Sequence, residues 1–169
     1  AFQNCSGLTN VTIGDSVTSI SSTAFLECDN LMSVTIGNSV TTIDAKAFYD
    51  CTSLTSVTIG DSIRWIGSWA FSNCPIKCVS LPSSAVSSIP KDYLETVIIT
   101  SGSSIDSSAF RDCTNLTSVT IPDSVTTVGD YAFYGCSTLK EIYFNATAMN
   151  DLASDNYVFY TGKNGSEIR

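Results

Sequence analysis

Cysteine is the residue type whose number and spacing in this chain most suggest chemistry. The chain has seven Cys and no His, and six of the Cys follow a regular spacing: Cys5, Cys28, Cys51, Cys74, Cys113 and Cys136. A thiol series of this kind raises the possibilities of zinc binding and of disulfides. An odd count prevents complete internal pairing, stacked equivalents point the same way, and no C-x-x-C pair or His completes a zinc site. We therefore expect six small buried apolar residues, no metal and no cofactor, and an exposed free thiol at Cys78, an outward strand position.

A second candidate group is cationic and aromatic. Trp65 and Trp69 stand where other units carry Ser, Thr or Lys, and Arg64 precedes the first of them. Trp and Arg are frequent anchors of binding interfaces, so Arg64, Trp65, Trp69 and Tyr93 are candidate binding residues. The alternative is structural, because the following unit lacks part of its apolar pattern and large rings would fill the gap.

These residues are positioned by an internal repeat with a period of 23 residues. The unit has the consensus AF-x-x-C-x-x-L-x-x-V-x-I-x-x-x-V-x-x-I. Strict alternation over residues 33–36 (Ser-Val-Thr-Ile) predicts a strand with one buried face, and Gly-Asn-Ser at 37–39 predicts a turn. A second short extended piece follows at 40–43. Apolar residues at i, i+1, i+4 and i+7 from Ala47 then predict a short helical turn, capped by Asp44.

No single unit of this length buries its apolar stripe, so stacked units must cover one another. We predict a right-handed α/β horseshoe-like solenoid. It would have a parallel concave sheet of about seven strands, with short strands and short helical turns on its other sides. The expected strands of the main sheet are Leu8–Ile13, Leu31–Ile36, Leu54–Ile59, Ile76–Leu81, Leu94–Ile99, Leu116–Ile121 and Leu139–Phe144.

The repeat is not uniform along the chain. We interpret residues 1–169 as one solenoid and as a segment of a longer array, because the pattern begins in mid-unit and is still continuing at the last residues. Residues 75–94 form an irregular, shortened repeat in which the Ala-Phe helical turn is missing. Residues 145–169 form a lengthened repeat that leads into an eighth strand.

Outward positions of the predicted strands form two parallel rows of side chains. Most are Ser or Thr, and the exceptions gather toward the C-terminal end. The candidate binding residues on this concave face are Ser56, Thr58, Thr96, Ile98, Ser118, Thr120, Glu141 and Tyr143. A concave solenoid surface is commonly a docking face. The alternative is a solvated strand face whose Ser and Thr serve only β-propensity.

Composition excludes several classes of function. Of the 169 residues 14% are charged, and the net charge of −8 opposes binding to nucleic acid or to anionic membranes. No apolar run is long enough to span a bilayer, and no signal peptide is visible in this chain. With no His, no paired carboxylate, no phosphate loop and no nucleophile signature, we predict no catalytic residues and no enzymatic activity.

The strand motif L-x-x-V-x-I resembles that of leucine-rich repeats. The full unit, as in residues 116–136 (LTSVTIPDSVTTVGDYAFYGC), looks like the BspA-like subfamily from surfaces of anaerobic bacteria and some protozoan parasites. The resemblance implies a cell-surface or secreted protein, a non-catalytic module that binds a host or matrix protein as an adhesin. The alternative function is a structural spacer that holds another domain away from the cell surface. We expect a monomer in either case.

Overall fold

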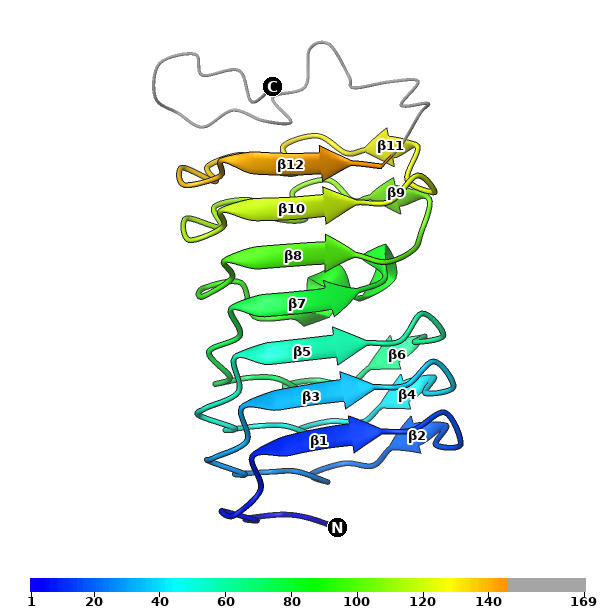
Figure 1. Cartoon of the computed structure of the whole chain (residues 1–169), viewed down its shortest axis with the longest axis vertical. Coiled ribbons are helices and arrows are strands. Elements are labelled where there is room, and N and C mark those ends of the chain that lie inside the picture. Colours follow the sequence, from blue (N-terminus) through cyan, green and yellow to red (C-terminus); the bar gives the residue numbers. More distant parts are fainter. Residues whose placement is uncertain (146–169) are drawn as a thin grey trace.

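Seven parallel strands form the main side of the protein in the computed structural model, which describes residues 1–145. In spatial order they are β1 (Asn10–Ile13), β3 (Ser33–Ile36), β5 (Ser56–Ile59), β7 (Cys78–Leu81), β8 (Thr96–Ile99), β10 (Ser118–Ile121) and β12 (Glu141–Phe144). Figure 1 shows them stacked one above another along the molecule. The predicted solenoid with a parallel sheet of seven strands is confirmed. Below, each turn of the solenoid is called a coil and is named after the main-sheet strand with which it begins.

Short parallel strands form the second side of the solenoid. β2 (Ser19–Ile20), β4 (Thr42–Ile43) and β6 (Trp65–Ile66) make one small sheet, and β9 (Ser104–Ile105) and β11 (Thr127–Val128) make another. Ile20, Ile43 and Ile66 are paired in register. The repeated Ile therefore builds one continuous apolar column along this side.

The third side consists of consecutive turns rather than the predicted short helical turns. In the β3 coil, Lys46 and Asp50 adopt left-handed conformations, with φ of 57° and 62°. Alternate N–H groups then leave their own coil, so that the Phe48 N–H donates to the Ala70 carbonyl of the next coil at 2.8 Å. An α-helix would keep every N–H inside the coil. Hydrogen bonding between stacked coils therefore replaces the helix that the apolar spacing alone suggested.

The Phe residues of the repeat form two stacks in the core. Phe2, Phe25, Phe48 and Phe71 lie with successive ring centroids 5.3, 5.0 and 5.1 Å apart, and Phe110 stacks on Phe133 at 5.2 Å. Offset stacking at these distances is favourable for aromatic rings. Between residues 71 and 110 the stack is interrupted by the irregular β7 coil.

The β7 coil holds the one helix among residues 1–145, the 3₁₀-helix η1 (Ser83–Ser88). This helix lies between the two small sheets, behind β7 and β8 in Figure 1. Cys78 pairs with Thr96, only 18 residues later, so this coil is too short for a second strand and a full third side. The coil that the sequence predicted to lack a helical turn is thus the one that contains a helix, because a tight 3₁₀ turn spans the corner with fewer residues.

The gap in the core is filled by aliphatic side chains of the β7 coil. Ala85 and Val86 of η1 are buried, and so is Ile89 just after it. Trp65 and Trp69 remain 61% and 62% exposed, so the rings do not fill the gap. The structural alternative for the two Trp is therefore wrong.

No helix in the described part of the chain is long and apolar enough to cross a membrane. The lengthened repeat predicted over 145–169 lies, except for Asn145, outside the described residues.

Candidate functional site

The outward residues of the main sheet form two continuous rows in register, as the alternation predicted. One row joins Asn10, Ser33, Ser56, Cys78, Thr96, Ser118 and Glu141, and the other joins Thr12, Thr35, Thr58, Ser80, Ile98, Thr120 and Tyr143. All eight candidate residues of this face lie in these two rows. They form a flat surface without a deep pocket at its C-terminal end, which suits contact with another macromolecule better than enclosure of a small ligand.

Chemical variety on this surface is concentrated in β8 and β12. Ile98 is 42% exposed and Tyr143 is 51% exposed, although their row is otherwise Ser and Thr. Thr120 pairs with both residues, so they lie two strands apart, about 10 Å at the usual strand spacing. Two exposed apolar side chains at this separation form an anchor of the size that binding interfaces use.

A carboxylate and a phenol are joined beside this apolar pair. The Tyr143 hydroxyl donates a hydrogen bond to Glu141 Oε2 at 2.9 Å. This hydrogen bond and the nearby negative charge raise the pKa of the Tyr143 phenol, because an ionised phenolate would face the carboxylate. The bond fixes the direction of both side chains, so β12 presents an oriented acidic and aromatic edge.

An ion pair borders the same surface at the irregular coil. Lys77 Nζ lies 2.8 Å from Glu95 Oε1, at the residues that precede β7 and β8. The hydrogen bond and charge of Glu95 raise the pKa of the Lys77 ammonium. Both side chains are about half exposed, so the pair orients charge at the rim of the face and adds little to stability.

The four aromatic-patch candidates are divided between separate places. Arg64 and Trp65 line a hollow of about 190 Å³ against Ser84 and Ala85 of η1. Trp69 lies on the third side, where Lys46 Nζ is 5.4 Å from its ring and 5.5 Å from the Tyr49 ring. Tyr93 is 55% exposed and lines neither of these two hollows. The structure therefore does not bring the four residues into one patch.

The cysteine row has a role that the sequence analysis missed. Five of its members are buried, as predicted, and Cys5 is partly buried. Each thiol of the regular coils donates to the carbonyl of the Phe in the preceding coil, as Cys51 Sγ does to Phe25 at 3.1 Å and Cys74 Sγ does to Phe48 at 3.0 Å. A spacing of 26 residues from Phe to Cys was the signal in the sequence. The Cys is thus a small apolar residue that also satisfies a buried carbonyl.

The buried thiols are poor nucleophiles and poor metal ligands. Burial and the neighbouring thiol raise the pKa of Cys74 and of Cys136 far above the ordinary value of a thiol. No group of three or more metal-binding side chains occurs in residues 1–145. Cys78 is the exception, because its side chain is exposed on the sheet face, as the sequence predicted.

The repeat and its geometry now permit a comparison with known proteins. A family model described as the BspA type leucine-rich repeat region matches the chain in six copies, over residues 1–97 and 91–169. The chain belongs to the BspA type leucine-rich repeat family. The strand motif L-x-x-V-x-I and the Ala-Phe segment are thus the family's strand and turn, and the resemblance inferred from the sequence is confirmed.

Several solved structures are similar to this BspA type repeat region. A leucine-rich repeat protein from Bacteroides ovatus is 26% identical, with a TM-score of 0.45, and the match covers 80% of this chain and 37% of that one. A Treponema pallidum leucine-rich repeat protein, printed as T. pallidum, is 24% identical, with a TM-score of 0.44 over 80% of this chain and 58% of that one.

A third structure comes from Faecalibacterium prausnitzii and is described as a leucine-rich cell surface protein. It is 23% identical, with a TM-score of 0.28 over 81% of this chain and 61% of that one. The BspA type region therefore spans less than two thirds of the length of each of these proteins. A comparison with curated proteins gave no match.

Proposed function

We propose that this chain is a non-catalytic module that binds a protein partner on the outer face of its main sheet. The contact residues would be Thr96, Ile98, Ser118, Thr120, Glu141 and Tyr143, with Ser56 and Thr58 at the edge. The observation that carries the proposal is the exposure of Ile98 and Tyr143 on a face that is otherwise Ser and Thr. An exposed apolar pair adds nothing to this chain's own core, whereas burial under a partner would remove it from water.

We further propose that the protein acts at the cell surface, in adhesion to a host or matrix protein, as a monomer. The description of the Faecalibacterium prausnitzii protein as a cell surface protein supports this placement. The exposed rings of Trp65 and Trp69 are proposed as separate secondary contacts, since each indole leaves most of its area open to solvent.

The test uses the labelled chain against an array of immobilised extracellular matrix and serum proteins. A variant with Ile98→Thr, Glu141→Ser and Tyr143→Thr converts the C-terminal part of the face to the residue types of the other coils. Its stability should be close to that of the parent, because those residue types already occupy these rows. We expect its binding to weaken by about tenfold or more, the usual effect of removing central anchors.

The matched control is a variant with Ser33→Ala, Thr12→Ala and Thr35→Ala, at the other end of the same rows. We expect this control to bind like the parent. Equal binding by the C-terminal variant and the parent would contradict the proposed site. A chain that binds nothing on the array would instead favour the structural spacer.

A further inference from the structure

Regular coils of this solenoid are joined on the third side by a ladder of backbone hydrogen bonds. In the β8 coil, the Ser108 and Phe110 N–H groups donate to the carbonyls of Asp130 and Ala132 at 2.9 and 2.7 Å. At the start of the same side, the Gly129 N–H donates back to the Ile105 carbonyl at 2.8 Å. Each regular coil thus presents a donor and then a row of acceptors to the coil before it.

The ladder is open where the β8 coil faces the shortened β7 coil. Within residues 1–145, no backbone N–H donates to the carbonyl of Ser107, Ala109 or Arg111, and the Asp106 N–H has no backbone acceptor. These are the positions that a regular preceding coil would satisfy. The β8 coil therefore has an unpaired edge with the hydrogen-bonding pattern of a parallel chain.

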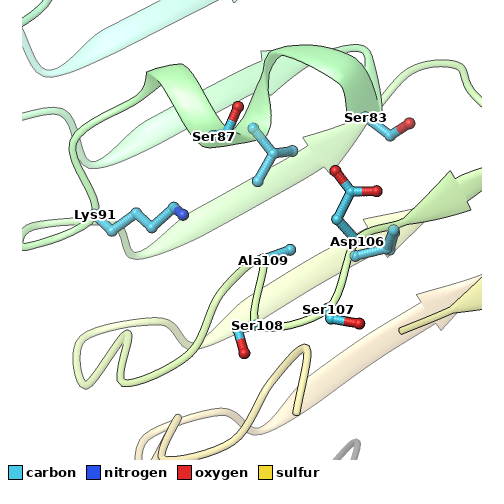
Figure 2. Close-up of a pocket in the computed structure, with 9 residues that line it drawn as sticks. Ser83, Ser87, Lys91, Asp106, Ser107, Ser108 and Ala109 are labelled. Carbon is cyan, nitrogen blue, oxygen red and sulfur yellow. The ribbon is translucent and has the colours of Figure 1, made fainter. Parts of the chain in front are cut away.

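A hollow of about 170 Å³ lies against this edge. Residues 105–109 form one wall, and Ser83, Val86 and Ser87 of η1 with Lys91 form the other. Figure 2 shows Lys91 at one end of the hollow and Asp106 at the other. The two do not pair with each other, because the ion pairs of the described residues are Lys77–Glu95 and Arg111–Asp112.

The charges agree with the direction of the open ladder. A peptide that runs parallel to residues 105–109 has its amino end beside the Asp106 carboxylate and its carboxyl end toward the Lys91 ammonium. An antiparallel peptide would bring its carboxylate to Asp106 instead. Pockets for drug-sized ligands are about 300–1,000 Å³, so this smaller hollow limits the ligand to a few residues.

We propose that the hollow between η1 and residues 105–109 binds a short peptide with free termini, about two or three residues long at about 3.3 Å per residue. The peptide ammonium pairs with Asp106, its N–H groups donate to the Ser107 and Ala109 carbonyls, and its carboxylate pairs with Lys91. Small side chains of the peptide lie against Val86 and Ile105. This site is separate from the sheet face and does not depend on the partner proposed for that face.

The experiment uses the full chain, with trialanine as the probe, in isothermal titration calorimetry and saturation-transfer NMR. We expect saturable binding with one site per chain. The N-acetylated, C-amidated tripeptide keeps the backbone groups but lacks both charges, so its affinity should fall by about tenfold or more, because charge-assisted hydrogen bonds are the stronger ones. Absence of trialanine binding, or equal affinity of the blocked peptide, would overturn the proposal.

Variants locate the binding. Lys91→Met and Asp106→Asn should each weaken trialanine binding about tenfold, and Ser87→Trp should abolish it by filling the hollow from η1. The matched controls are Asp44→Asn, at the equivalent position of a regular coil, Lys140→Met, and Ser84→Trp on the far side of η1. All should bind like the parent, with melting temperatures within a few degrees of it. Retained binding in Ser87→Trp, or equal losses in the controls, would place the peptide elsewhere and overturn the proposal.

Discussion

Truncation of the stacked Phe residues should reveal a gradient of stability along the solenoid. Phe48 is fully buried and stacks on Phe25 and on Phe71, at 5.0 and 5.1 Å. Phe110 is equally buried but stacks on one described ring, Phe133. Phe2 is 52% exposed and stacks only on Phe25. The three substitutions to Ala thus remove the same side chain with different burial and different numbers of ring partners.

The expected magnitudes follow from these contacts. Loss of a buried Phe costs about 3–5 kcal/mol, and each stacked pair contributes about 0.5–1.5 kcal/mol beyond burial. Phe48→Ala should therefore lie near the upper end, at about 5 kcal/mol. Phe110→Ala should cost about 1 kcal/mol less because it loses one pair fewer, and Phe2→Ala about 2 kcal/mol because half of its surface is already in water.

The measurement is equilibrium unfolding in urea, followed by circular dichroism and by the Trp fluorescence, with linear extrapolation to water. The m-value should stay constant across the three variants if each remains folded as the parent is. A loss below about 1 kcal/mol for Phe48→Ala would mean that the Phe column is not the core. Equal losses for Phe48→Ala and Phe2→Ala would refute the role given to stacking between coils.

Three further predictions concern the thiols and the left-handed backbone positions. Cys51→Ala should cost about 2 kcal/mol from lost burial and a lost hydrogen bond, and Cys51→Ser, which keeps a donor to the Phe25 carbonyl, about 1 kcal/mol less; equal urea midpoints for the two would deny the hydrogen bond any weight. Because the pKa of Cys74 is raised from an ordinary value of 9.0 in the folded chain, unfolding is favoured once the pH exceeds 9.0, so the free energy of unfolding should decline from there upward, and a thiol titration of the folded chain should find one fast group, Cys78. Thr23 has a φ of 57°, which a β-branched residue rarely adopts, so Thr23→Gly should raise the unfolding free energy by about 0.5–1 kcal/mol, and a lower melting temperature would count against this reasoning.

The candidate sheet face was determined by the sequence in full detail. Alternation with a period of two assigns every residue of a strand to one face, and a period of 23 residues places equivalent residues side by side. Ile98, Thr120 and Tyr143 therefore had to lie in one row, which the register of β8, β10 and β12 confirms. The buried Phe and Cys columns follow from the same two periods.

The backbone path of the third side was not determined in this way. Apolar spacing around Ala47 and Phe48 says which side chains enter the core, but a helical turn and a run of turns bury the same side chains. The choice falls to the N–H groups, which bond to the carbonyls of the next coil rather than to their own. That preference exists only once a second coil is in place.

The irregular coil shows the same division most clearly. From the sequence alone, the shortened spacing after Cys74 indicated that a part of the repeat was missing. Only the tertiary structure decided what replaces it: η1 turns the corner, Val86 and Ile89 fill the core, and the edge at Ser107 and Ala109 is left unpaired. Local patterns determine which residues are buried, whereas the pairing of backbone groups depends on neighbours that lie one coil away in space and about 20 residues away in the chain.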